Sequence, residues 1–214
     1  MFKVRRVPGY GLIDADYGRR LRTASRTDGP ILMLTLTKFL PGNPTAADSN
    51  DGAGSYAASS YAPITLLASV GAELRFVADV VAGSADWDRV AVVGYPSRQS
   101  FIDLAVRPDF QGWHARNRER VARTTVLGTL PLNSLPAEVD PRRILLEIWH
   151  GAVPDRVADG PVAVCDVEGT IIGDGRQWSG ARYTAIALGT ALPLQEPSAD
   201  YQALLLAPRI MRCR

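Results

Sequence analysis

The two histidines of the chain each follow a tryptophan, in the pairs Trp113-His114 and Trp149-His150. An imidazole exchanges a proton near neutral pH, which suits it to general acid–base chemistry. An indole offers a flat apolar wall and one N–H donor, so it suits an aromatic ligand. The sequence therefore contains two candidate sites for binding an aromatic molecule and moving its proton.

Four arginines follow His114 within one short segment: Arg116, Arg118, Arg120 and Arg123. Arg118 lies four residues after His114, which places both side chains on the same face of a helix. The forked donors of a guanidinium can hold an oxyanion such as a phenolate or an enolate. We therefore predict that His114 and Arg118 are catalytic, with His114 moving the proton and Arg118 holding the anion. The alternative is that Trp113 packs in the core while His114 and the arginines form a solvated face.

Two tyrosines, Tyr61 and Tyr95, fall close to the cleft that we expect between a helix and a sheet. Together with Trp113, Trp149 and His150 they form the set of residues that we predict to bind the substrate. Core packing is the alternative for each tyrosine. For His150, which stands at a predicted strand end, the alternative is a local hydrogen bond.

The signatures of several catalytic classes are missing from the sequence. There is no H-E-x-x-H and no C-x-x-C, so no motif marks a metal site. There is no G-x-G-x-x-G after a strand, no P-loop and no G-x-S-x-G turn. The carboxylates are scattered, and none is paired at a spacing typical of acid–base work. Catalysis by this chain would therefore use substrate reactivity, proton transfer and shape, without a metal.

The composition is that of a globular protein with a sizeable core, with 46% hydrophobic and 21% charged residues in a chain of 214. A formal net charge of +2 without runs of like charge argues against a nucleic-acid partner. No stretch is apolar enough to span a membrane, and the N-terminus lacks the apolar core of a signal peptide. The two cysteines fit a reduced pair. We therefore expect a cytoplasmic protein that binds a small aromatic substrate and no membrane.

Strand and helix signals alternate from residue 30 to residue 132. Strands are predicted at 31–39, 73–81, from Trp87 to Gly94 and at 124–130, and helices at 55–68 and 97–122. Ser97 is suited to cap the second helical segment, and Pro108 divides that segment in two. This β-α-β-β-α-β order is typical of a ferredoxin-like α+β domain. We assign residues 1–29 to an N-terminal extension that packs against it.

The remainder, residues 143–214, is rich in strand signals and poor in helices. Strands are predicted at 143–150, 161–167, 183–189 and 201–210. This half is either a degenerate ferredoxin-like repeat of the first or a simple β-extension, joined by a linker at 133–142. An uncovered apolar sheet must be buried, so it either completes a barrel with the first half or covers another subunit. We therefore expect a homodimer or an internally paired barrel.

The central segment also carries a resemblance to a known family. Residues 87–132 read WDRVAVVGYPSRQSFIDLAVRPDFQGWHARNRERVARTTVLGTLPL. The pattern of WD, an apolar strand, YPS and a helix bearing His and Arg resembles the DUF1330-type members of the dimeric α/β-barrel superfamily, over about half the chain. That resemblance implies a ferredoxin-like dimeric α/β barrel with a pocket between the second helix and the sheet.

The resemblance also implies a class of reaction. A DUF1330-like chain with a second strand-rich half looks like the angucycline ring-opening oxygenases of the jadomycin, kinamycin and gilvocarcin pathways. These imply a metal-free monooxygenase of aromatic polyketide biosynthesis that oxidises a hydroquinone or phenol with O2, with Baeyer–Villiger-like C–C cleavage and reduced flavin (FADH2 or FMNH2) as cosubstrate. One alternative is a non-catalytic DUF1330-type small-molecule-binding protein. Another is a haem-handling relative with His114 as ligand.

Overall fold

The computed structural model describes residues 6–7, 11–24, 28–41, 64–83, 85–133, 143–155, 158–160, 162–187, 190, 192 and 198–211. Its elements, in chain order, are β1 (Arg6–Val7), β2 (Gly11–Ile13), α1 (Ala15–Thr23), β3 (Ile31–Phe39), α3 (Ile64–Ala68), β4 (Glu73–Gly83), β5 (Arg89–Tyr95), α4 (Arg98–Ala105), α5 (Pro108–Arg118), β6 (Val121–Pro131), β7 (Arg143–Trp149), β8 (Val162–Gly173), β9 (Gly180–Ile186) and β10 (Tyr201–Met211). No helix within these ranges is both long and apolar enough to cross a membrane.

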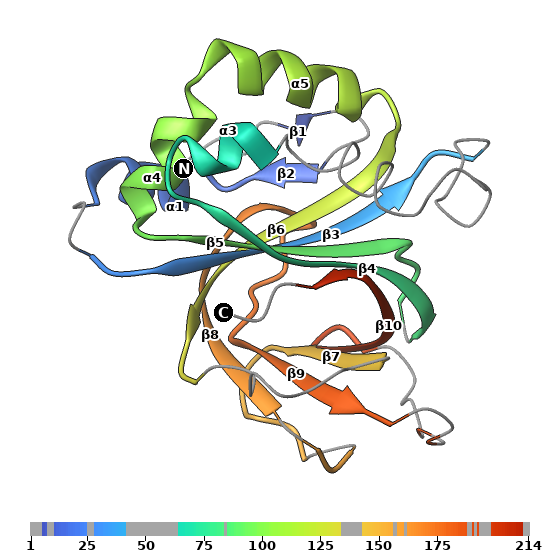
Figure 1. Cartoon of the computed structure of the whole chain (residues 1–214). Helices are drawn as coiled ribbons and strands as arrows, with labels where there is room; N and C mark the ends of the chain where they lie inside the picture. Colours follow the sequence, from blue (N-terminus) through green and yellow to red (C-terminus); the bar gives the residue numbers. More distant parts are fainter. Residues whose placement is uncertain are drawn as a thin grey trace.

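Eight of the strands form a closed antiparallel barrel (Figure 1). Their order is β8-β6-β3-β5-β4-β10-β7-β9, and β9 pairs back onto β8 to close the ring. The short strands β2 and β1 extend the sheet outward from β8. Two long pairings therefore join the halves of the chain, β8 with β6 and β10 with β4.

The predicted ferredoxin-like α+β fold class is wrong. The protein is mainly β, and its described helices have only 9, 5, 8 and 11 residues. The physical reason is that β8 and β10 hydrogen-bond to β6 and β4, the two edges that a four-stranded sheet would leave open. Of the two ways to cover the second half, completion of a barrel with the first half is the one observed. The homodimer stays a prediction.

Most of the predicted local elements are confirmed. Strand β3 has the predicted bounds, and all four strands predicted in the second half are present. Ser97 caps α4, since its hydroxyl accepts a hydrogen bond from the Ser100 N–H at 3.1 Å, and Pro108 begins α5. Of the predicted helix 55–68, only the end lies among the described residues, as α3.

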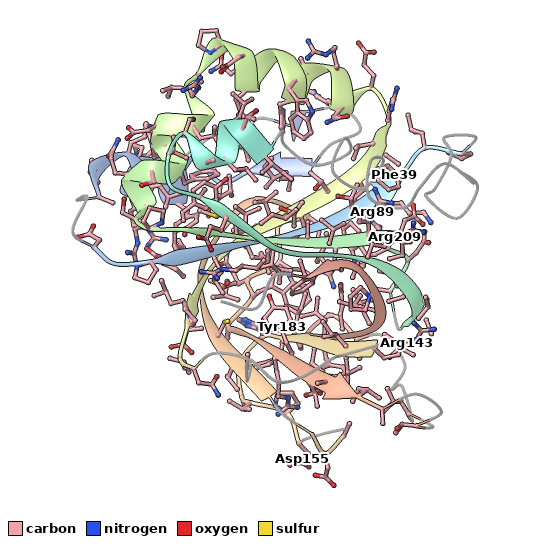
Figure 2. All side chains as sticks on the ribbon, in the orientation of Figure 1. Phe39, Arg89, Arg143, Asp155, Tyr183 and Arg209 are labelled. Atoms are coloured by element: carbon pink, nitrogen blue, oxygen red, sulfur yellow. The ribbon has the colours of Figure 1, made fainter. Side chains whose placement is uncertain are left out.

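The inside of the barrel is a packed apolar core. Alternate residues of each strand point inward, such as Leu34 and Leu36 of β3 and Val90 and Val92 of β5. Each side chain of this kind contributes roughly 1.5–3 kcal/mol when fully buried. Tyr183, labelled in Figure 2, belongs to this core and packs edge-on against Phe76 with ring centroids 5.8 Å apart.

The opposite face of β3, β5 and β4 forms a second core beneath the helices. Ile31 and Met33 point to this outer side, together with residues of α1, α3 and α4. Figure 1 shows the helices gathered on this side of the barrel. The structure describes every residue of helix α5, and none of them is fully buried. Each of α1, α3 and α4 has at least one buried residue. A cavity lies beneath α5.

Candidate ligand-binding pocket

A cavity of about 740 Å³ lies between α5 and the outer face of the barrel. Its floor is formed by β3, β5 and β6, with the end of β8 at one side, and its roof by α5 and part of α4. Ligand pockets commonly have volumes of roughly 300–1,000 Å³. The cavity is therefore large enough for a molecule of several fused rings.

The two-residue period of a strand determines which side chains form the floor. Met33, Thr35, Thr37 and Phe39 alternate along β3 with the leucines of the barrel core, so all four side chains face α5. Met33 is buried, whereas both threonines are only half-buried. The floor thus offers an apolar surface with hydroxyl groups set into it.

The period of the α-helix determines which side chains form the roof. Phe110, Trp113, His114 and Asn117 recur at spacings of three and four residues, which puts them on one side of α5. The rings of Phe110 and Trp113 stack with centroids 5.9 Å apart, and the Phe110 and His114 rings are 6.1 Å apart. A flat aromatic ligand would meet a wall of aromatic rings on this side.

The surroundings of His114 favour the neutral form of its imidazole. Burial lowers the pKa of its imidazole below the ordinary value of 6.5, and the nearby positive charge of Arg118 lowers the pKa further. A neutral imidazole can accept a proton from a hydroxyl group in the cavity. The electrostatics therefore suit His114 to the role of a general base.

A buried guanidinium, which the sequence reasoning missed, also lines the pocket. Arg89 of β5 is only 5% exposed, forms an ion pair with Asp79 at 3.2 Å, and lies over the ring of Phe39 at 5.3 Å. Asp79 also pairs with Arg209 of β10. Figure 2 shows Phe39, Arg89 and Arg209 near one another. Arg89 is the strand partner of Thr37, and this pairing between β5 and β3, which brings Arg89 to the pocket, has no signal in the sequence.

Asn117 is a second residue that the sequence reasoning missed. It lines the pocket three residues after His114. Its side-chain Nδ2 is buried and has no hydrogen-bond partner within the described part of the chain. The available signal was its place on the same helix face as His114 and Trp113.

The structure brings four of the predicted site residues to this cavity: Trp113, His114, Arg118 and Tyr95. Tyr95 is buried in the floor and meets Phe101 of α4 edge-on, with ring centroids 5.4 Å apart. Of the other three, Tyr61 lies outside the described residues.

Trp149 and His150 lie elsewhere and do not line this pocket. Trp149 packs on the outer face of β7, with the Arg182 guanidinium 5.7 Å from its ring. His150 is exposed, and its backbone N–H donates to the Asp200 carbonyl at 2.8 Å. The two tryptophan–histidine pairs are therefore in different environments, and the first is the one that lines the cavity of about 740 Å³.

Beside Trp149 the structure places a buried ion pair. Arg182 donates to Glu147 through Nε at 2.6 Å and Nη2 at 2.8 Å, and the Tyr201 hydroxyl donates to the same carboxylate at 2.9 Å. Arg182 also donates to the backbone carbonyls of Pro154 and Asp155. These contacts use both carboxylate oxygens and fix the loop after β7, so this cluster holds the fold together on the outer face of the second half.

Comparison with known proteins gives a structural likeness. No protein-family model and no curated protein matches the chain. The crystal structure of RPA0582 from Rhodopseudomonas palustris, a protein of unknown function, is 20% identical, with a TM-score of 0.40 over 54% of this chain and 91% of that one. The structure of methylated RPA0582 is also 20% identical, with a TM-score of 0.44 over 57% of this chain and 96% of that one. The chain is thus structurally similar to a protein of unknown function.

Proposed function

We propose that the pocket beneath α5 binds a flat, electron-rich hydroxyaromatic molecule and that the protein oxidises this molecule with O2. The proposed class is an oxygenase of aromatic polyketide biosynthesis acting on angucycline-type substrates. The observation that carries the proposal is the grouping of Trp113, His114 and Arg118 on the roof of one cavity of about 740 Å³. The resemblance of residues 87–132 to DUF1330-type chains supports the choice of reaction class.

The proposed chemistry begins with a proton. His114, neutral because its pKa is lowered by burial and by Arg118, accepts the proton of a substrate hydroxyl. The phenolate that results is more electron-rich than the phenol and therefore reacts more readily with O2. Arg118 holds the negative charge by charge-assisted hydrogen bonds, while Trp113 and Phe110 bury the ring faces.

The electron balance sets the need for a cosubstrate. A hydroquinone carries two electrons and two protons more than its quinone. With one O2 it can therefore take up one oxygen atom, become a quinone and release the second oxygen atom as water. A substrate already at the quinone level needs an external two-electron donor, and reduced flavin is the donor that we propose. In the Baeyer–Villiger-like case the oxygen atom enters the C–C bond next to a carbonyl and gives a lactone, which water then opens.

The test is oxygen consumption with an angucycline hydroquinone, followed by mass analysis of the product formed under ¹⁸O2. His114→Ala should bind the substrate but lose roughly 10²–10⁴-fold in rate, which is the usual contribution of a positioned proton-transfer group. Arg118→Ala should weaken binding and rate together. Arg116→Ala is the matched control, because Arg116 is exposed on the same helix and does not line the pocket.

Three outcomes would overturn the proposal in different ways. If His114→Ala and Arg118→Ala both react at the wild-type rate, the site lies elsewhere. If the substrate binds and the protein does not accelerate its oxidation, with or without reduced flavin, the chain is a binding protein. An absorbance band typical of haem in the purified protein would point instead to a haem-handling function.

A further inference from the structure

We infer that Asn117 selects ligands that carry a carbonyl oxygen beside the hydroxyl group on which His114 acts. The ligand class is then a hydroxyquinone or hydroxyketone, and a plain phenol should bind less well. This inference deepens the proposed function and rests on it, because it assumes that the same cavity holds a hydroxyaromatic ligand.

The first observation is an unsatisfied donor. In the part of the chain that the structure describes, three buried side-chain atoms have no hydrogen-bond partner: the hydroxyls of Tyr17 and Tyr183 and the Nδ2 of Asn117. Most buried polar atoms in proteins are hydrogen-bonded, so each exception calls for an explanation. Tyr17 and Tyr183 belong to the packed cores, whereas Asn117 lines the cavity. Of these three residues, Asn117 is therefore the one that stands beside a space large enough for a ligand.

The second observation is where that donor stands. Asn117 follows His114 by three residues, so their Cβ atoms are neighbours about 5–6 Å apart on one helix face. The backbone of Asn117 is fixed as well, since its carbonyl accepts the Arg120 N–H at 3.0 Å. A ligand whose hydroxyl meets His114 therefore presents a nearby ring substituent to Asn117.

The chemistry of the amide identifies that substituent. An Nδ2 group only donates, so its partner must be an acceptor. In the proposed function the oxygen of a plain phenol gives its proton to His114 and accepts hydrogen bonds from Arg118. A carbonyl on the same or the adjoining ring supplies a second oxygen. When the hydroxyl of a hydroxyquinone loses its proton, the negative charge spreads onto the conjugated carbonyl. A donor at Asn117 then stabilises the same anion that Arg118 holds.

The experiment compares two matched ligands under argon, by quenching of tryptophan fluorescence. One is α-hydroxyanthraquinone and the other is α-hydroxyanthracene, which has the same rings without the carbonyls. The wild-type protein should bind the quinone roughly 5- to 100-fold more tightly, the range expected for one additional buried hydrogen bond. Asn117→Leu should abolish that preference, and Arg116→Ala, the exposed control, should keep it.

A second readout requires no ligand. Asn117→Leu removes a buried donor without a partner, so the thermal midpoint of the free protein should not fall and should rise if the donor is unsatisfied in solution. A marked fall would show that Nδ2 has a partner within the free protein and would overturn the inference. Asn117→Asp, which offers only acceptors, should lose the quinone preference, and its retention would contradict the inference.

The failures of the two proposals are distinguishable. Binding of neither ligand to the wild-type protein would remove the proposed function and this inference with it. Equal binding of both ligands to the wild-type protein and to Asn117→Leu would leave the hydroxyaromatic pocket standing and remove the role of Asn117.

Discussion

The packing of α1 against the barrel depends on a notch formed by two glycines. Gly128 of β6 and Gly169 of β8 are register partners, and the fully buried ring of Tyr17 lies against both. A Cβ atom added at Gly169 would stand 2.5 Å from Cδ2, 2.6 Å from Cγ and 2.8 Å from Cε2 of that ring. Since Cγ is at the base of the side chain, rotation of the ring cannot relieve the clash. We therefore predict that Gly169→Ala displaces α1.

The expected magnitude follows from overpacking. Inserting one methyl group into a well-packed site typically costs about 1–3 kcal/mol. For a chain of this size, 1 kcal/mol lowers the thermal midpoint by about 2–4 °C, so Gly169→Ala should lower it by roughly 2–12 °C. Gly18→Ala is the control on the same helix. An added Cβ there meets only the end of Arg22, at 3.7 Å, and alanine is favoured in a helix, so this variant should gain up to about 1 kcal/mol.

A double-mutant cycle measured by urea unfolding tests the mechanism. Tyr17→Ala alone should cost about 3–5 kcal/mol, as for other large aromatic side chains. In that background the notch is empty, so Gly169→Ala should cost almost nothing, giving a coupling energy of about 1–3 kcal/mol. The reasoning is refuted if Gly169→Ala leaves stability unchanged, or if it costs the same with and without the Tyr17 ring.

Two further predictions concern charged groups. Arg182→Met leaves the fully buried Glu147 carboxylate without its ion-pair partner, so urea unfolding should show a loss of about 3–5 kcal/mol. The double change with Glu147→Leu should recover much of that loss, and a double variant no more stable than the single one would contradict this account. Because the pKa of His114 is lowered below 6.5, kcat/KM should fall only as the pH drops below about 6.5, and this limb should be absent in His114→Asn. The lowered pKa of His114 also makes the stability of the fold depend on pH. Its contribution to stability is complete above about pH 6.5 and is lost as the pH falls through the folded-state pKa, because the unfolded state then binds the proton more tightly. A rate limb above pH 7 in the wild type alone would show that another group titrates.

The elements that the sequence predicted well are those set by neighbouring residues. The bounds of β3 follow from the run ILMLTLTKF, in which Leu32, Leu34 and Leu36 recur on one face, and the start of α4 follows from the hydroxyl of Ser97. The closure of the barrel depends on pairings between distant segments, such as β8 with β6 and β10 with β4. Periodicity assigns a residue to a face of a strand but does not identify the neighbouring strand. The ferredoxin-like expectation failed for that reason.

In the candidate site, too, the features set by neighbouring residues were predicted and those set by distant residues were not. Spacing along one helix was enough to group Trp113, His114 and Arg118. His114 and Arg118 are four positions apart and lie close together on any helix, and Trp113 adjoins His114 in the chain. Residue type alone could not show whether Trp113-His114 or Trp149-His150 lines the pocket, since the second pair has the same two residues at the end of a strand. The sequence reasoning also missed Arg89, which reaches the pocket only through the pairing of β5 with β3.

The contrast between the floor and the roof of the pocket bears on how a ligand would bind. The floor belongs to a closed barrel in which β3 is hydrogen-bonded on both sides and packed on its inner face, so the floor residues have little freedom. The roof is a helix without a fully buried residue, whose aromatic side chains face the cavity across from the floor. A flat ligand would add apolar contacts to those that Phe110 and Trp113 make with the second core. Its ring would lie between the sheet on one side and α5 on the other, and its polar edge would lie where His114, Asn117 and Arg118 follow one another along that helix.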